Sequence, residues 1–201
     1  MKTQLLVATL ASVITSVLVA AESPRVGAAA PDFSLADSKG ATHSLVDYKG
    51  KYVVLEWFNP ECPFVKKHYG GGNMQKLQQE YAGQGVVWLS IDSSAAGKEG
   101  HLSPDAANKQ MSEWKMNHTT LLLDAAGKAG QAYGAKNTPH MFVINPEGKI
   151  VYEGAIDSKP TANPSDIASS TNYVKAALDQ VMSGKPVTNP TTKPYGCSVK
   201  Y

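Results

Sequence analysis

The sequence predicts an α/β protein with a central mixed β-sheet covered by helices on both faces. Two stretches, "YVVLEWF" at 52–58 and "GVVWLSID" at 85–92, are continuously apolar and rich in β-branched and aromatic residues, which is typical of strands buried on both sides. Segments with helical patterns follow each of them, so strands alternate with helices. The segment 140–156 predicts a hairpin with an Asn-Pro-Glu-Gly turn, which adds antiparallel strands.

The first predicted helix lies directly after the first buried strand. It begins at Pro63, because proline is favoured in the first helical turn. Gly70–Gly72 interrupt it, and Asn73 is predicted to cap a second helix that ends at 83. Three glycines weaken a helix, so they are either a hinge that lets this region open or a tight corner between two helices.

The other predicted elements continue the alternation. In chain order they are an irregular segment at 24–35, a turn, short strand and turn at 38–51, a polar loop at 93–104, a helix at 104–116, a short strand at 119–124, a short helix at 125–135, a loop at 157–168, a helix at 170–184 and a tail at 185–201.

Composition excludes several classes of protein. The chain has 201 residues, 42% of them apolar, which is enough for a core and argues against global disorder. Its formal net charge is only +2, so we expect no nucleic-acid partner. No repeat or linker divides the chain, and residues 22–201 are predicted to form a single domain.

The N-terminus predicts an export signal at residues 1–21. A short positive start precedes an apolar stretch, and "VAA" before Glu22 fits a small-residue cleavage site. A membrane anchor is the alternative, but the stretch is short and contains Thr and Ser. We therefore expect a periplasmic or secreted protein, with no stable membrane insertion after cleavage and in an oxidising compartment.

Cys62 is the first of two cysteines and the strongest candidate for chemistry. It follows a buried strand and precedes Pro63, which places it at a helix N-terminus. Free amide groups and the helix dipole stabilise an anion there, and such sites lower a cysteine pKa from ~8.5 to as little as ~3.5. Lys66, one turn further on, adds positive charge. The alternative is a structural half-cystine.

Two segments resemble a known family. "VVLEWFNPECPFV" is similar to the strand, corner and reactive cysteine of thioredoxin-fold proteins, and "NTPHMFVINPEGKIVYEG" is similar to their cis-proline strand and final hairpin. The tail "KPYGCSVKY" resembles the cysteine-bearing tail of some members. The chain is thus identified as resembling the exported peroxiredoxin-like (AhpC/TSA) redoxins, and the resemblance implies a thioredoxin-like fold over the whole mature chain.

The resemblance implies a set of site residues. Cys62 would be the nucleophile and Cys197 the resolving cysteine, because the local CxxC pair is incomplete in both possible alignments, or registers. In the first register Cys62 is the first cysteine of the motif, and the second position is Val65. In the second register Cys62 is the second cysteine, and the first position is Asn59. The prolines and glycine of the tail would keep it extended and mobile enough to reach. Thr138–Pro139 would be a cis pair facing Cys62.

Glu56 is a fifth candidate. In the first register it takes the place of the buried acid that moves protons for the thiol. The alternative, a glutamate paired with a surface lysine, is left open at this point. His68 and His140 are weaker candidates near Cys62, because single histidines are usually structural or exposed.

The implied activity is that of a thiol-based oxidoreductase without cofactor or metal. Its partners would be a thiol reductant or a partner disulfide protein, with a small peroxide also possible. Peroxiredoxins use an arginine against the thiolate, whereas 18 of the 19 basic residues here are lysines and the arginine, Arg25, lies far from Cys62 in the sequence. The alternatives are a redox-inert module with a structural Cys62–Cys197 disulfide, and a copper-binding module using Cys62, His140 and Met141.

Overall fold

A seven-stranded mixed sheet forms the centre of the protein. The computed structural model describes residues 25–201, so the export signal predicted at 1–21 lies outside the described residues. The sheet has the order β2-β1-β5-β4-β3-β7-β8. Its strands are β1 (Ser34–Asp37), β2 (Thr42–Ser44), β3 (Val53–Trp57), β4 (Val87–Asp92), β5 (Thr120–Leu123), β7 (His140–Ile144) and β8 (Ile150–Gly154).

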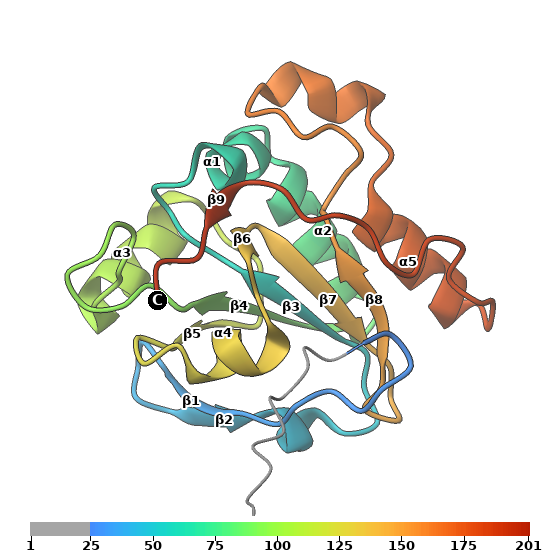
Figure 1. The fold of residues 1–201 in the computed structure, drawn as a ribbon, viewed down its shortest axis with the longest axis horizontal. Helices are drawn as coiled ribbons and strands as arrows, with labels where there is room; N and C mark the ends of the chain where they lie inside the picture. Colours follow the sequence, from blue (N-terminus) through green and yellow to red (C-terminus); the bar gives the residue numbers. More distant parts are fainter. Residues whose placement is uncertain (1–24) are drawn as a thin grey trace, which may run out of the picture.

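The sheet contains both kinds of strand pairing. β3, β4 and β5 are parallel to one another, whereas β7 pairs antiparallel with β3 and β8 antiparallel with β7 (Figure 1). The parallel strands need crossover helices and the hairpin needs only a tight turn, which the sequence supplies at Asn145–Gly148. The predicted α/β class with a mixed sheet is therefore confirmed.

Helices cover both faces of the sheet. They are α1 (Pro63–Gly70), α2 (Asn73–Ala82), α3 (Pro104–Glu113), α4 (Lys128–Tyr133) and α5 (Tyr173–Met182). One apolar cluster joins one face of the sheet to α1, α2, α3 and α5, and a second joins the other face to α4 and the 3-10 turn η1 (Leu45–Tyr48). Alternate residues of β3 contribute to the two clusters, as the period of a strand requires.

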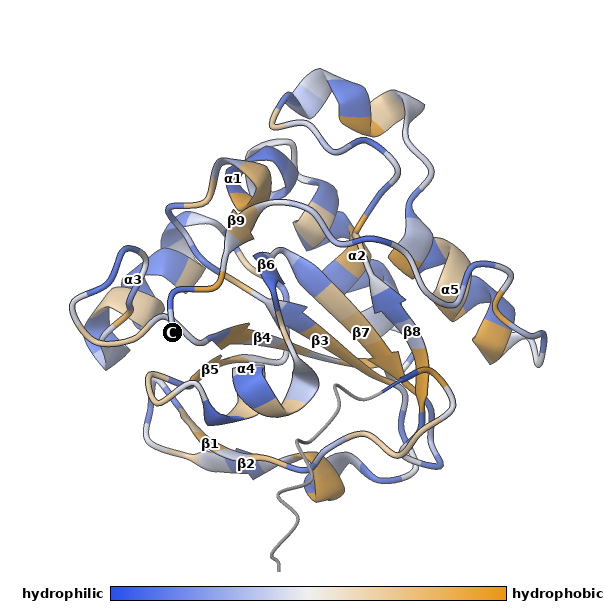
Figure 2. Ribbon diagram, viewed as in Figure 1, coloured by the Kyte–Doolittle hydropathy of each residue, from blue (hydrophilic) through white to orange (hydrophobic). Residues whose placement is uncertain are grey.

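The two continuously apolar stretches are the central strands. Every residue of β3 and β4 is buried, and Figure 2 shows the apolar colouring concentrated on the strands of the sheet. Each large apolar side chain removed from water contributes about 1.5–3 kcal/mol, so these strands are the main source of hydrophobic stabilisation in the sheet. Their burial confirms the prediction made from composition alone.

Some element boundaries differ from the sequence prediction. The predicted cap Asn73 is the first residue of α2, and Gly72 precedes it as the N-cap in the left-handed region (φ 69°), which glycine adopts without steric cost. α3 ends at Glu113 rather than 116, because Lys115 adopts φ 50° and cannot continue a helix. The segments predicted as irregular contain β1 and a 3-10 turn, η2 (Pro164–Ser169), which tertiary contacts select.

The C-terminal tail is ordered rather than free. β9 (Cys197–Ser198) pairs antiparallel with β6 (Asn137–Thr138) in a separate two-stranded sheet. Figure 1 shows this tail passing beside α1 and β6 before the chain ends. The tail was expected to be extended and mobile enough to reach Cys62, and in the structure backbone pairing and side-chain contacts hold it beside β6. Within residues 25–201, no helix is both long enough and apolar enough to cross a bilayer.

Candidate active site

Cys62 is the N-cap residue of α1 and is buried. It follows β3, and Pro63 occupies the first helical position, as predicted. Its side chain is only 1% exposed. The turn before it is held by Asn59, whose carbonyl oxygen accepts from the Cys62 amide (3.2 Å) and whose side-chain oxygen accepts from the Glu61 amide (2.8 Å). The sequence thus builds a rigid strand-to-helix corner that points one thiol at the adjacent strand.

The adjacent strand is β6, and its end carries a cis peptide bond. The bond between Thr138 and Pro139 is cis, as the resemblance implied. The Cys62 Sγ lies 3.0 Å from the carbonyl oxygen of Thr138. That oxygen accepts the proton of the neutral thiol. Thr138 and Pro139 therefore lie against the cysteine, in the place where they were predicted.

The second cysteine reaches the same place through β9. Cys197 is directly opposite Thr138 in the β6–β9 pairing, and its thiol is close enough to Cys62 for each thiol to shift the pKa of the other. Gly196 lies so close to β6 that a Cβ atom there would be 2.1 Å from the Thr138 carbonyl oxygen. Both cysteines are free thiols. The structure thus brings together two residues that are far apart in the sequence.

The two thiols have opposite pKa shifts. Burial raises the pKa of Cys62, but hydrogen bonds from the Cys197 and Thr138 side chains and from backbone amides, including that of Val65, outweigh it, so the pKa lies below its ordinary value. Burial and the neighbouring Cys62 raise the pKa of Cys197 to about 12. Of the two thiols, Cys62 is therefore the one that loses its proton more readily, and Cys197 is the one that keeps it.

Glu56 lies in the core as the centre of a hydrogen-bond network. It is fully buried and accepts from the side chains of Tyr69 (3.0 Å), Trp88 (2.9 Å), Ser90 (3.0 Å) and Gln78 (3.5 Å). Burial raises its pKa to about 7, against the effect of these donors. Its hydrogen-bond partners are core side chains, so the alternative of a glutamate paired with a surface lysine is wrong. Cys62 is not among these partners, so Glu56 makes no hydrogen bond to the thiol.

The two histidines considered as possible neighbours of Cys62, His68 and His140, are neutral and bonded elsewhere. Burial lowers the pKa of both His68 and His140 to about 4. The Nδ1 atom of His140 lies 3.4 Å from the Lys136 amide, and its ring packs on Phe142. Among residues 25–201, no group of three or more His, Cys, Asp and Glu side chains is arranged to hold a metal ion.

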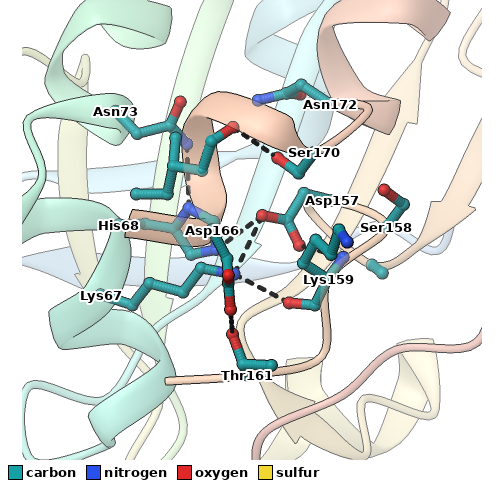
Figure 3. Close-up of polar contacts among 12 residues, drawn as sticks. Lys67, His68, Asn73, Asp157, Ser158, Lys159, Thr161, Asp166, Ser170 and Asn172 are labelled. Atoms are coloured by element: carbon teal, nitrogen blue, oxygen red, sulfur yellow. Dashed lines mark hydrogen bonds and ion pairs between the residues drawn. The ribbon is translucent and has the colours of Figure 1, made fainter. Parts of the chain in front are cut away.

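Lys66 does not face the thiol. Its ammonium group forms an exposed ion pair with Glu61 (2.9 Å). The next residue, Lys67, is buried instead, and its ammonium group is bonded to Asp157 (3.0 Å) and to the carbonyl oxygen of Lys159 (2.8 Å), as Figure 3 shows. The sequence analysis missed Lys67 and Asp157, because a lysine in "FVKKHYG" carries no sign of burial.

The tail is held on both sides of Cys197. Before it, the Tyr195 hydroxyl reaches Asp157 and His68. After it, Tyr201 packs against Gly127 and Gly130, where any Cβ would collide with its ring, and donates to the Ala135 carbonyl (2.9 Å). These two tyrosines were also missed, since only the folded chain brings their partners together.

Comparison with known proteins decides the family. The AhpC/TSA family model matches residues 26–153, which include Cys62, Thr138 and Pro139. The chain belongs to the AhpC/TSA family. Cys197 lies beyond the matched region, so the tail that supplies the second thiol of this AhpC/TSA protein is an addition to the part that the family model describes.

Individual relatives agree with this assignment. The thiol-disulfide oxidoreductase ResA of Bacillus subtilis is 29% identical over 140 residues, which cover 70% of this chain and 73% of ResA. A crystal structure of a hypothetical protein from Sinorhizobium meliloti is similar with a TM-score of 0.76 and 26% identity, covering 90% of this chain and 96% of that one.

A second solved structure identifies the fold. The thioredoxin domain of a thiol-disulfide oxidoreductase from Bacteroides vulgatus has a TM-score of 0.53 and 23% identity, over 73% of this chain and 98% of that domain. The fold of this AhpC/TSA protein is therefore thioredoxin-like, as the resemblance implied.

Proposed function

We propose that this protein is a thiol-disulfide oxidoreductase that cycles between a dithiol and a Cys62–Cys197 disulfide. The observation that carries the proposal is the contact between the two thiols across the cis-proline strand, with Cys62 favoured as the thiolate. A thiolate beside a thiol is the arrangement that disulfide exchange needs. The family and the oxidoreductase names of the relatives support the same class of reaction.

The cycle proceeds in two displacements. The Cys62 thiolate attacks one sulfur of a partner disulfide, forming a mixed disulfide and releasing the partner's other sulfur as a thiolate. Cys197 then loses its proton and attacks Cys62 Sγ, which releases the second partner thiolate and leaves the Cys62–Cys197 disulfide. The partner disulfide is reduced to two thiols, and a thiol reductant restores the protein by the reverse steps.

Access to Cys62 requires the tail to move. With 1% of its surface exposed, Cys62 is covered, and the β6–β9 pairing that covers it involves only two residues from each strand. Short pairings at the surface open at low cost in free energy. The partner is therefore expected to enter by displacing residues 196–198, and Glu56 and Thr138 act as parts of the rigid surroundings.

Rapid peroxide reduction is less well supported. Arg25 lies next to the segment in which the Gly27 amide bonds to the carbonyl oxygen of Ile150 (2.8 Å). Ile150 pairs with Ile144 at the end of β7 that is farther from Pro139. The guanidinium group is thus carried by the opposite end of the sheet from the thiols, and the planar donor that would orient a peroxide is not supplied there.

The proposal also includes a single exported domain. Residues 22–201 form one redoxin domain whose tail is part of the active site, and residues 1–21 direct its export to the periplasm or the exterior. A disulfide cycle suits an oxidising compartment. Detection of the mature N-terminus near residue 22 in a periplasmic or secreted fraction supports export, whereas an intact N-terminus in the cytosol contradicts it.

The test of the cycle is direct. The reduced protein is mixed with glutathione disulfide, quenched with acid, and mapped by mass spectrometry, while its turnover of a fluorescent disulfide peptide is measured with a thiol reductant. We expect a Cys62–Cys197 disulfide in the wild type and loss of turnover in Cys62→Ser. A wild type that forms no such disulfide, or a Cys62→Ser variant with full turnover, would refute the proposal.

A further inference from the structure

A buried polar cluster lies under the tail, against α1. Its charged centre is Lys67 with Asp157, whose side chains are 0% and 1% exposed and whose charged atoms are 3.0 Å apart. His68 belongs to the same cluster: its Nδ1 accepts from the side chain of Asn73 (2.9 Å), as Figure 3 shows. The Nε2 atom of His68 therefore carries the proton and is available as a donor.

Tyr195, in the tail, completes this cluster. Its hydroxyl donates to Asp157 and lies 3.2 Å from His68 Nε2 and 3.4 Å from the Lys67 ammonium group. Its ring packs edge-on against Phe64, with the ring centres 5.7 Å apart. One side chain of the tail is thus bound at its polar end by three buried groups, and along its ring by the first turn of α1.

The cluster is fully satisfied, and it joins three separate parts of the chain. Lys67 and His68 come from α1, Asp157 from the segment after β8, and Tyr195 from the tail. Burying an ion pair costs desolvation free energy, and replacing such a pair with hydrophobic residues of similar size often leaves a protein equally stable or more stable. A buried network in which every group is bonded does, however, specify one arrangement of the segments that it joins.

That arrangement bears directly on the thiols. Tyr195 precedes Cys197 by two residues, and the residue between them, Gly196, has its carbonyl oxygen bonded by the Asn137 side chain (2.9 Å). The backbone from Tyr195 to Cys197 therefore has little freedom once the tyrosine is in place.

We propose that Tyr195 is a positioning residue, which the cluster of Lys67, His68 and Asp157 uses to hold Cys197 against Cys62 in the dithiol. This inference rests on the proposed function and assigns the step that the cluster controls. In that step Cys62 carries a mixed disulfide, Cys197 loses its proton and attacks Cys62 Sγ, and the partner thiolate leaves. After the partner has displaced residues 196–198, the binding site for Tyr195 guides the tail back to one position, so Cys197 makes this attack with a shorter conformational search, which is the advantage of preorganisation.

The test compares two tyrosines of the same chemistry. Tyr195→Phe keeps the ring contact with Phe64 and removes only the hydroxyl. Tyr81→Phe is the matched control, since the Tyr81 hydroxyl also donates to an aspartate, Asp179 (2.6 Å), and lies near Lys175 (3.5 Å). These contacts join α2 to α5, and none of these hydroxyl partners lies in the tail. The full mature chain is used for each.

Two quantities are measured by rapid mixing with glutathione disulfide and mass mapping. They are the rate at which Cys62–glutathione converts to Cys62–Cys197, and the equilibrium between dithiol and disulfide in glutathione buffers. We expect Tyr195→Phe to slow closure by about tenfold or more and to disfavour the disulfide by a similar factor, as loss of a hydrogen bond to a charged group allows. Tyr81→Phe should change either quantity by less than about twofold, because the hydrogen bonds that it loses do not involve the tail.

The possible outcomes separate the two hypotheses. If the wild type closes its disulfide and Tyr195→Phe closes as fast as Tyr81→Phe, Tyr195 is not a positioning residue and the proposed function stands. If the wild type forms no Cys62–Cys197 disulfide, both are overturned. Unfolding by urea, measured for the oxidised forms, distinguishes the two roles: slow closure with a loss of oxidised stability no larger than that of Tyr81→Phe beyond the measured shift of the disulfide equilibrium supports positioning, and slow closure that tracks a larger, general loss of stability overturns it.

Discussion

Cys197 lies directly opposite Thr138 in the β6–β9 pairing, and the Thr138 carbonyl oxygen lies 3.0 Å from Cys62 Sγ. One residue of the cis-proline strand therefore holds both thiols, the first through its carbonyl oxygen and the second through backbone pairing. Because both sulfur atoms are in place in the dithiol, oxidation needs little rearrangement of this part of the chain. The predictions below follow from that geometry.

The pKa of Cys62 should depend on the Cys197 thiol. Burial alone would raise the Cys62 pKa, and the hydrogen bond from Cys197 is first among the contacts that lower it. We expect Cys197→Ala to raise the Cys62 pKa, because it removes this charge-assisted hydrogen bond. Cys197→Ser keeps a hydroxyl donor and should raise it less. Alkylation rate against pH measures both, and equal values in the two variants would contradict the prediction.

Removing the resolving thiol should also leave oxidised Cys62 without a second step. In Cys197→Ser, the mixed disulfide formed with glutathione disulfide should persist on Cys62, and a peroxide pulse should drive that sulfur to the sulfinic acid. We expect the wild type to show mainly the intramolecular disulfide under the same conditions. Mass spectrometry after each treatment reports both. A variant in which Cys62 resists both reagents would show that it is not the nucleophile.

Glu56 should make stability fall as pH rises. Its pKa is about 7 in the folded protein, above the ordinary value, so between about pH 4.5 and 7 the folded state binds more protons than the unfolded state. Its contribution is present in full at low pH and is lost as pH rises through 7. The loss is on the order of 3 kcal/mol, from 1.36 kcal/mol per pKa unit.

The matched variant is Glu56→Gln, which keeps one acceptor oxygen and does not titrate. The difference in urea unfolding free energy between wild type and variant, followed from pH 4.5 to 8, isolates this group from other titrating residues. We expect the wild type to lose stability relative to the variant across that range. A constant difference would mean that Glu56 keeps one protonation state throughout.

The sequence was enough to predict the features that depend on neighbouring residues. The buried strands β3 and β4 follow from their composition, and the place of Cys62 follows from the proline after it. The cis bond at Pro139 was predicted from the resemblance of its segment. These predictions need little knowledge of distant contacts.

The missed features depend on residues far apart in the chain. Lys66 and Lys67 are adjacent and chemically identical, yet one is exposed and the other buried, because only Lys67 faces Asp157 and the tail. Similarly, "KPYGCSVKY" looks like a flexible tail until Tyr195 has a buried partner. Pairing of β9 with β6 is a tertiary choice that no local pattern encodes.

The glycines Gly70–Gly72 should act as a corner rather than as a hinge for disulfide closure. Gly72 has φ 69° between α1 and α2, and a Cβ on Gly71 would lie 2.8 Å from Ile167. Since Cys197 is already beside Cys62, closure does not require this turn to open. We expect Gly70→Ala, which meets open space, to stabilise the protein by up to about 1 kcal/mol without changing closure. Slower closure with more over-oxidised Cys62 would restore the hinge hypothesis.

Gly196 should be required both for its closeness to β6 and for its backbone angle. Its φ is 124°, and a Cβ would lie 2.1 Å from the Thr138 carbonyl oxygen, so Gly196→Ala cannot keep the β6–β9 pairing. We expect the tail to leave the site, so that alkylation of Cys62 becomes faster by tenfold or more, in proportion to the fraction of open molecules, and disulfide closure becomes slower.

Gly184→Ala is the control for that substitution. Gly184 also has a positive φ, 73°, but a Cβ there meets nothing within 4 Å. It should cost about 1–2 kcal/mol of stability from backbone strain and leave both rates of Cys62 unchanged. If Gly196→Ala also leaves them unchanged, the tail does not cover Cys62 in solution, and the enclosed thiol pair is not the resting state of the protein.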